Sequence, residues 1–297
     1  MPFRAKSFRG RPSGGACPPC PPTPPAVTQY GTVQELITAS SALDAGYYEV
    51  SGIVLTYWDG TDFRDADGGN IIDVSPIMDH LSDVALWISR GNKVGSGAPV
   101  TTAATHWVAR HPLTQRSVFG TSRTVSDIGG AQSITFAGAA WTTPDDALYD
   151  VTGPFEVFAV VQLSNNADTN KGIVGHFSGG GGWILGASDF NSPFGVWFGW
   201  GGTYVRASGR LGTDPHVVHG RYDGSNLYIS VDGVDVGGPT AKTGTSAIAT
   251  SLVLGGYDSN AMTHVNGKIS ESVIIKKSLT TQERADIVAH LMASVGI

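Results

Sequence analysis

The sequence has 297 residues, of which 15% are charged, with 40 glycines and a formal net charge of −6. The acidic balance gives the main body no electrostatic reason to bind nucleic acid. No apolar run reaches the ~18 residues that a membrane-spanning helix needs, which excludes membrane insertion by that route. Few charges, many glycines and frequent aromatic residues are typical of an all-β protein with many turns.

Residues 1–28 are predicted to form an extended arm. The first part is basic without a single acid, and a proline-rich stretch, CPPCPPTPP, follows it. Such a composition buries too little apolar surface to fold alone, and its prolines favour an extended, semi-rigid chain. We expect the arm to anchor the protein on neighbouring proteins; contact with nucleic acid through the basic side chains is the weaker alternative. The expected anchoring residues are Phe3, Arg4, Lys6, Phe8, Arg9 and Arg11.

Cys17 and Cys20 form a lone CxxC motif within this arm. Redox chemistry usually needs a βαβ context and zinc needs two more ligands, and the sequence indicates neither. Solvated thiols are the simplest interpretation, and interchain disulfides in an oligomer are the alternative.

Residues 29–80 are predicted to form a small β-hairpin module. After a short helix expected at 32–43, residues 46–63 alternate between faces as a strand pair does, and Asp59-Gly60 is a hairpin turn sequence. The run from Leu36 to Gly69, which contains Tyr-Trp-Asp-Gly-Thr, resembles small hairpin modules in tail and head fibres of tailed bacteriophages. Any exposed hairpin with Trp58 beside Asp59-Gly60 would look alike, which is the alternative.

Residues 81–297 are predicted to form one large two-sheet sandwich. Short strands separated by turn signals recur along this region, and no helices alternate with them as a parallel sheet would require. The predicted strands are Val84–Ser89, Ser133–Ala137, Phe155–Leu163, Gly172–Phe177, Gly182–Ala187, Phe194–Trp200, Thr203–Ala207, Val217–Tyr222, Leu227–Val231, Ser251–Gly255 and Lys268–Ile275. Asp232-Gly233 supplies the positive-φ residues of a two-residue hairpin turn.

A helix is predicted at the end of the chain. Thr280-Thr281-Gln282-Glu283 has the pattern of a capping box, and Ile287, Leu291 and Val295 recur at helical spacing. We expect this amphipathic helix to plug one end of the sandwich.

The C-terminal third resembles the concanavalin A-like lectin/glucanase superfamily, and specifically its laminin-G-like jelly rolls. The matching pieces, in order, are Arg221–Gly233, Leu254–Tyr257, Asn266–Ile275 and Leu279–Arg284, and Ala85–Ile88 and Ile134–Gly138 look like the opening strands. The resemblance implies an antiparallel jelly-roll sandwich of two sheets. It does not settle function, because this fold hosts lectins, glycosidases, adhesion modules and structural domains.

Catalysis is not expected. The glucanase branch of the superfamily carries a Glu-x-Asp-x-(x)-Glu strand, whereas the glutamates here are scattered at 35, 49, 156, 271 and 283. Glu271 lies on a strand between apolar same-face neighbours, so we expect it to pair with a Lys, an Arg or a backbone amide. There is also no Gly-x-Ser-x-Gly elbow and no phosphate-binding loop of the Gly-x-x-x-x-Gly-Lys type.

No metal or cofactor site is predicted. His216 and His219 are the closest useful histidine pair, but strand alternation puts them on opposite faces. Some laminin-G-like domains bind calcium at the sandwich rim, and the alternative to solvated turn residues is a calcium site built from loop oxygens. The candidate ligands for that alternative are Asp168, Asn170, Asp189, Asp258 and Asn260.

A sugar-stacking site is the sharper of two interpretations for a group of aromatic residues. Trp197, Trp200 and Tyr204 bracket Gly201-Gly202, so a hairpin there would place an aromatic ring at its tip, with Trp183 nearby in sequence. These four residues are the candidate ligand-binding residues, and packing in the core or within the hairpin is the favoured alternative.

The function that the sequence favours is that of a structural virion protein of a tailed bacteriophage, in a tail fibre, a head fibre or a capsid decoration. Its arm would contact other virion proteins, and its lectin-like domain would face host-surface glycans. The resemblance to fibres implies a homo-oligomer, with a trimer favoured. The basic N-terminus lacks the apolar segment of a signal peptide, so we expect synthesis in the host cytoplasm and display on the virion surface. A free bacterial carbohydrate-binding or adhesion protein is the alternative.

Overall fold

The computed structural model describes residues 28–30, 46–50, 53–58, 63–64, 76–80, 83–88, 102–103, 113–116, 125–129, 131–137, 140–142, 145–164, 171–188, 195–257 and 264–297. Several predictions lie outside these residues. They concern the anchoring residues Phe3, Arg4, Lys6, Phe8, Arg9 and Arg11, the pair Cys17 and Cys20, the helix at 32–43, the turn at Asp59-Gly60, and the loop oxygens of Asp168, Asn170, Asp189, Asp258 and Asn260.

A small sheet precedes the sandwich in the chain. It has the order β1 (Thr28–Tyr30), β2 (Gly46–Val50), β3 (Ile53–Trp58) and β4 (Phe63–Arg64). Strands β2, β3 and β4 pair antiparallel, as the alternating sequence predicts, while β1 runs parallel to β2.

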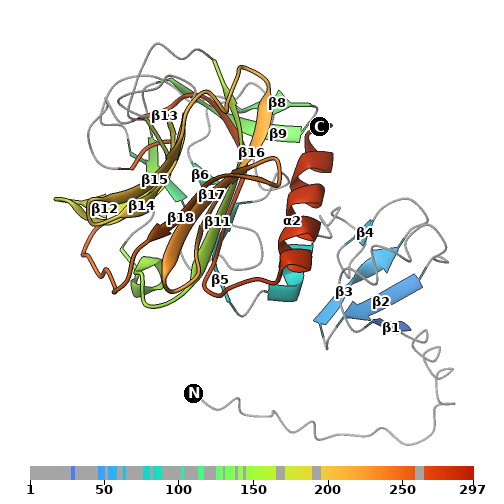
Figure 1. Cartoon of the computed structure of the whole chain (residues 1–297). Coiled ribbons are helices and arrows are strands. Elements are labelled where there is room, and N and C mark those ends of the chain that lie inside the picture. Colours follow the sequence, from blue (N-terminus) through green and yellow to red (C-terminus); the bar gives the residue numbers. More distant parts are fainter. Residues whose placement is uncertain are drawn as a thin grey trace, which may run out of the picture.

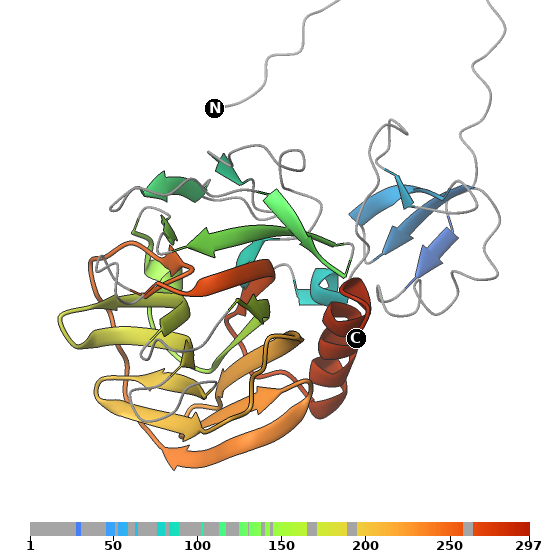
Figure 2. The same ribbon diagram turned by 90° about the horizontal axis from the view of Figure 1, so that it is seen from above.

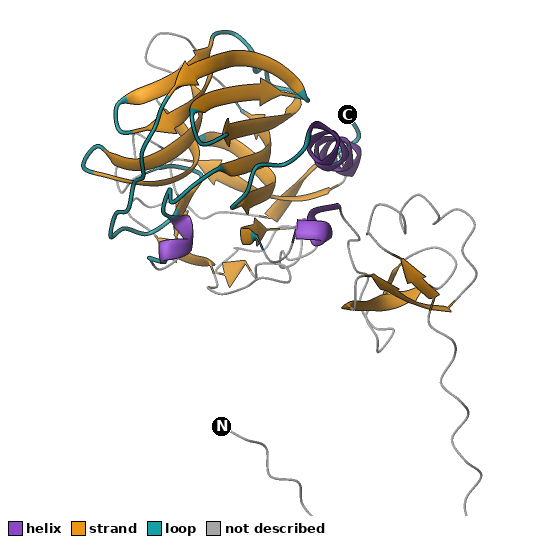
Figure 3. Ribbon diagram, turned by 60° about the horizontal axis from the view of Figure 1, so that its bottom comes forward, coloured by secondary structure: helices purple, strands orange, loops and turns teal. Residues whose placement is uncertain are grey.

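Two antiparallel sheets build the main body, and Figure 3 shows their strands stacked in layers. We call them the β13 sheet and the β11 sheet. The β13 sheet has the order β15 (Thr203–Ala207), β14 (Val196–Trp200), β13 (Gly181–Ser188), β12 (Lys171–Ser178), β19 (Val253–Leu254), β10 (Ala140–Thr142), β7 (Leu113–Arg116) and β6 (Thr102–Ala103). The β11 sheet has the order β18 (Val234–Ala241), β17 (Asn226–Val231), β16 (Pro215–Tyr222), β11 (Phe155–Leu163), β20 (Asn266–Ile275), β9 (Ala131–Ala137) and β8 (Val125–Ile128), with β5 (Val84–Ile88) paired to β20. The predicted all-β fold class is confirmed.

The core lies between the two sheets. On β11 the face that carries Phe155, Val157 and Ala159 belongs to one buried cluster with Leu185 of β13 and Phe198 of β14. Burying this many apolar side chains between two amphipathic sheets is the main stabilising term for such a sandwich.

The outer face of the β11 sheet is covered as well. Glu156, Phe158 and Val160 alternate with the core residues of β11 and are all 0% exposed. Helix α2 (Thr281–Ser294) and the 3-10 helix η2 (Pro76–His80) lie beside this sheet in Figures 1 and 2. The predicted position of the C-terminal helix is therefore corrected: it packs beside β16 and η2 instead of plugging an end of the sandwich.

Turn chemistry fixes the meander from β16 to β18. Asp232 has a φ of 51° and Gly233 a φ of 79°, which is the left-handed pair that a tight two-residue hairpin turn requires. One turn earlier, the Asp223 side chain accepts hydrogen bonds from the amides of Ser225 and Asn226, at 2.8 Å and 2.7 Å. The turn at Asp232-Gly233 agrees with the sequence prediction.

The predicted capping box starts helix α2. The Thr280 hydroxyl accepts from the Glu283 amide at 3.2 Å, and the Glu283 carboxylate accepts from the Thr280 amide. Ile287 and Leu291 face inward at 0% exposure. Among the described helices, none is both long enough and apolar enough to cross a membrane.

Candidate functional site

Four aromatic side chains form a row on the outer face of the β13 sheet, which is the face turned away from the core. This outer aromatic row consists of Tyr204, Trp197, Tyr257 and Phe177. Successive ring centroids lie 5.4 Å apart (Tyr204 to Trp197), 5.6 Å apart (Trp197 to Tyr257) and 5.6 Å apart (Tyr257 to Phe177), each pair edge to face. Strand alternation explains the placement, since β14 sends Phe198 into the core and Trp197 to the outside.

Two glycines let these rings lie against the sheet. A Cβ atom at Gly186 would lie 2.1 Å from the Trp197 indole, and one at Gly175 would lie 2.6 Å from Cβ of Tyr257. No side chain other than hydrogen fits at either position without displacing the ring. The glycines thus hold the two inner rings of the row in fixed orientations.

The row has two well-buried and two partly exposed members. Trp197 and Tyr257 are 4% and 6% exposed, whereas Tyr204 and Phe177 are half-buried. Burial raises the pKa of the Tyr204 phenol, and the nearby Arg206 charge opposes this only in part. Arg206 lies over the ring, with its guanidinium carbon 5.3 Å from the ring centroid. Tyr204 is thus a neutral, partly exposed phenol beside a cation, with an apolar ring and a polar hydroxyl.

The predicted ligand residues fall on opposite faces of the β13 sheet. Trp197 and Tyr204 belong to the outer row, but Trp183 and Trp200 point into the core and are 1% and 2% exposed. The Trp183 indole N–H donates to the Tyr149 carbonyl at 2.7 Å. A ring enclosed by the core offers no face to a sugar, so Trp183 and Trp200 are corrected to core residues.

The predicted hairpin itself is present. Gly201 and Gly202 have φ values of 54° and 77° and connect β14 to β15 as a two-residue turn. Trp200, directly before the turn, packs inward against Tyr222 with centroids 4.4 Å apart. Trp200 points inward because it lies two residues from Phe198 and therefore on the same face of β14. The sequence shows that the two residues share a face, but it does not show that this face is the core side.

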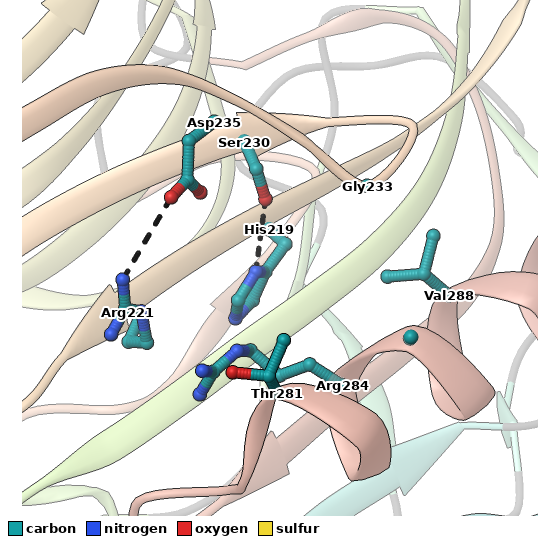
Figure 4. A pocket seen from close by; sticks show the side chains of 9 residues that line it. His219, Arg221, Ser230, Gly233, Asp235, Thr281, Arg284 and Val288 are labelled. Atoms are coloured by element: carbon teal, nitrogen blue, oxygen red, sulfur yellow. Dashed lines mark hydrogen bonds and ion pairs between the residues drawn. The ribbon is translucent and has the colours of Figure 1, made fainter.

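A second candidate site is a pocket of about 460 Å³ between the β11 sheet and helix α2, which we call the α2 pocket. Figure 4 shows that its side chains come from β16, β17, the β17–β18 hairpin and the first two turns of α2. The polar residues that line it are His219, Arg221, Ser230, Asp235, Thr281 and Arg284.

A buried hydrogen-bond chain forms the floor of the α2 pocket. Ser230 Oγ lies 3.0 Å from His219 Nδ1, and His219 Nε2 lies 2.9 Å from a carboxylate oxygen of Glu156. The same carboxylate accepts from the Leu279 amide at 2.9 Å and from the Arg284 guanidinium at 3.0 Å. Glu156 is 0% exposed, and these partners come from β16, from α2 and from the residue two positions before α2.

These partners keep Glu156 ionised. Burial alone would raise the pKa of this carboxyl group, but the hydrogen bond and charge of His219, the Leu279 amide and Arg284 together lower it below its ordinary value. An ionised carboxylate only accepts hydrogen bonds, so the His219 Nε2–H donates to Glu156. His219 is further held by stacking on Phe158, with centroids 4.1 Å apart.

The order Ser230–His219–Glu156 is that of a nucleophilic triad, but its setting is that of a structural network. Ser230 is 3% exposed, and Glu156 is shared with the backbone and the guanidinium that bring helix α2 onto the sheet. We therefore assign the chain of hydrogen bonds to holding the helix and orienting His219.

Sequence reasoning missed Glu156 as part of a site. The register pairs Glu156 with Arg221 and Phe158 with His219, so all four side chains share the outer face. The alternation on Phe155–Leu163 could have indicated this face, but the pairing of β11 with β16 is not visible in the sequence.

The two other predicted polar groups have partners of their own. His216 Nδ1 lies 2.8 Å from Asp232, away from His219, as strand alternation predicts. Glu271 is 0% exposed and accepts from the Trp87 indole N–H at 2.7 Å, a donor that the sequence analysis did not name. Within the described residues, no group of three or more His, Cys, Asp or Glu side chains is arranged to hold a metal ion.

Comparison with known proteins supports the fold. No protein-family model matches the sequence, and no curated protein matches it. Domain 4 of AbnA, a GH43 extracellular arabinanase from Geobacillus stearothermophilus that was solved with arabinotriose, is similar with a TM-score of 0.54 and 14% identity, covering 69% of this chain and 98% of that one. The binding domain of Paraclostridial Mosquitocidal Protein 1 is similar with a TM-score of 0.51 and 9% identity, covering 70% of this chain and 52% of that one.

A third similar structure comes from botulinum neurotoxin type C, a toxin whose cell entry depends on interaction with two ganglioside molecules. It has a TM-score of 0.51 and 10% identity, and the match covers 71% of this chain and 52% of that one. The sandwich is thus similar in fold to these three structures. At these identities, the similarity concerns the fold alone.

Proposed function

We propose that the sandwich is a glycan-binding domain that uses the outer aromatic row. The observation that carries this proposal is the pair of partly exposed rings, Tyr204 and Phe177, held in place by the buried Trp197 and Tyr257 between them. Rigid rings on a sheet lose little conformational entropy when a sugar stacks on them. The arabinotriose complex of the similar arabinanase domain agrees with a sugar as the ligand class.

No catalytic role forms part of this proposal. Glu156 and Glu271, the glutamates of the described sandwich strands, are both 0% exposed and both lie on the β11 sheet. Hydrolysis of a glycoside needs a pair of carboxylates flanking the bound sugar, and neither glutamate belongs to the sheet that carries the aromatic row.

For the whole chain, we propose a structural virion protein of a tailed bacteriophage that displays this glycan-binding domain on a fibre or as a capsid decoration. The support is the run from Leu36 to Gly69, with its resemblance to fibre hairpin modules, and the basic, proline-rich arm of residues 1–28. In this proposal the arm contacts other virion proteins, and the chain forms a homo-oligomer, with a trimer favoured.

The glycan-binding proposal is tested with a glycan array. The wild-type protein is expected to bind a subset of bacterial-surface glycans, Tyr204→Ala to lose at least tenfold in affinity for them, and Tyr204→Phe to retain most of it because the ring remains. Both variants are compared with the wild type by circular dichroism to establish folding. Equal binding by folded Tyr204→Ala and wild-type protein would rule out the row as the site.

The virion proposal is tested on purified particles. Antibody raised against the sandwich is expected to label intact particles in negative-stain images, and crosslinking is expected to join residues 1–28 to another virion protein. Absence of the chain from particles, with recovery from the medium as a free protein, would instead support the bacterial adhesion protein.

A further inference from the structure

The α2 pocket lies on the other sheet from the outer aromatic row and is built differently. Six of its lining side chains are polar, and two of these, Arg221 and Arg284, are permanent cations. Its volume of about 460 Å³ accommodates a ligand the size of one sugar unit.

Arg221 is oriented before any ligand arrives. Its guanidinium carbon lies 3.7 Å from the centroid of the Tyr228 ring, which fixes the plane of the group and leaves its N–H edges for hydrogen bonds. Its ion-pair partner is Asp235, at 4.0 Å, whose side chain is 68% exposed. A pair this long and this solvated is weak, so an entering anion can replace it.

Arg284 stands on the opposite wall, on the first turns of α2, and Figure 4 shows it reaching toward His219. Its NH1 group donates to Glu156 at 3.0 Å and to the Leu279 carbonyl at 2.6 Å. The guanidinium has five N–H donors in all, so this anchoring leaves others for the pocket.

The charges around the pocket favour an anion. Among the residues that line the pocket, Asp235 at the rim is the carboxylate, and Glu156 lies beneath His219. Glu156 is sealed from solvent and its oxygens are occupied by three partners. A ligand therefore meets the Arg221 guanidinium, whose carboxylate partner Asp235 is exposed, and the remaining N–H donors of Arg284, whose charge Glu156 already balances. The Thr281 hydroxyl lies beside them.

We propose that the α2 pocket is a binding site for a carboxylate group carried by a ligand of about monosaccharide size, such as an acidic sugar. Arg221 supplies the main contact, and Arg284 adds a second donor from the helix. The choice of a sugar as the carrier depends on the proposed function, whereas the carboxylate specificity follows from the pocket alone.

The test is isothermal titration of the full chain with glucuronate, N-acetylneuraminate, acetate and glucose. We expect saturable binding of at least one acidic sugar, weaker binding at high salt, and none of glucose at this site. Arg221→Gln is expected to reduce the affinity about tenfold or more, because a charge-assisted hydrogen bond is lost. The affinity of Arg221→Lys is expected to lie between those of the wild type and Arg221→Gln, since lysine keeps the positive charge but lacks the planar guanidinium group.

Two further variants sharpen the result. Asp235→Asn is expected to increase the affinity several-fold, because it removes the anion that competes for Arg221. Arg210→Gln is the matched control: it removes the same charge from an exposed position outside the pocket and is expected to bind like the wild type. The proposal would be overturned if folded Arg221→Gln protein had unchanged affinity. It would also be overturned if glucuronate, N-acetylneuraminate and acetate all failed to bind.

The same titrations separate the two sites. Tyr204→Ala is expected to bind acidic sugars in the α2 pocket as the wild type does. Arg221→Gln is expected to bind the glycans that the array identifies for the outer aromatic row as the wild type does. If acetate binds but neither acidic sugar does, the pocket is a carboxylate-binding site whose ligand is not an acidic sugar.

Discussion

At the scale of single residues, Glu156 is the group with the largest consequences. It is a fully buried carboxylate that stays charged because His219, Arg284 and the Leu279 amide all donate to it. Removing one member of such a set leaves the others as buried, unpaired polar groups, which costs more than the set itself contributes.

We predict that Glu156→Gln destabilises the protein by about 3–5 kcal/mol, because it leaves the Arg284 cation without its counter-ion. Urea unfolding followed by circular dichroism measures this. The control is Asp214→Asn, which removes a carboxylate at an exposed loop position and is expected to change stability by less than about 0.5 kcal/mol.

The same carboxylate gives stability a pH dependence with a definite sign. Its pKa is lower in the folded protein than its ordinary value, so its contribution is fully present above the unfolded value of about 4.3. The contribution is lost as the pH falls from there through the folded pKa. Glu156→Gln should therefore flatten the stability profile in this acidic range, and a variant profile parallel to that of the wild type would contradict the assignment.

Residues also show where sequence reasoning succeeds and where it stops. The turn at Asp232-Gly233 was predicted because its backbone angles depend on two adjacent residues. Glu156 was not predicted as a network centre, because its partners lie 63, 123 and 128 positions away in the chain. The sequence likewise shows that Trp197 and Trp200 lie on opposite faces of a strand, but it does not show which of the two faces the core.

At the scale of elements, helix α2 depends on its first turn. The capping box satisfies backbone amides that would otherwise have no partner, and the same turn carries Arg284 to Glu156. The helix start is therefore both a local structure and the attachment point of α2 on the β11 sheet.

We predict that Thr280→Ala destabilises the protein by about 1 kcal/mol through loss of the cap. Thermal unfolding measures the effect, and Thr243→Ala, at an exposed loop position, is the matched control. Because Arg284 lies in the turn that the cap starts, the variant is also expected to weaken acidic-sugar binding in the α2 pocket. Unchanged stability would show that Glu156, and not the cap, fixes the helix.

The long strands were the elements predicted best. Phe155–Leu163 matches β11, because it carries a long apolar run. Lys268–Ile275 lies within β20, because Ile269, Val273 and Ile275 recur in the sequence at multiples of the strand period of two. The strands β8 (Val125–Ile128) and β10 (Ala140–Thr142) were missed, since such short segments have too few residues for a period to be evident.

At the scale of the whole molecule, the two sheets share one core. Val157 of β11 and Leu185 of β13 belong to the same buried cluster, so neither sheet keeps its apolar face buried without the other. The sandwich should therefore unfold as one cooperative unit.

We predict that Val157→Ala and Leu185→Ala each destabilise the sandwich by about 2–5 kcal/mol, because each leaves a cavity in the shared core. Tryptophan fluorescence and far-UV circular dichroism should give coincident urea transitions for both variants. Separate transitions, each sensitive to only one substitution, would show that the sheets fold independently.

The position of β20 has a consequence for how the protein is made. This strand is the last in the chain, yet it lies inside the β11 sheet, where it pairs with β11, β9 and β5. Until Asn266–Ile275 has left the ribosome, β11 and β9 both have an open edge that is free to pair with other chains. Completion of the sandwich thus waits for the synthesis of β20, and nascent chains that stop before β20 are expected to aggregate more readily than the finished sandwich.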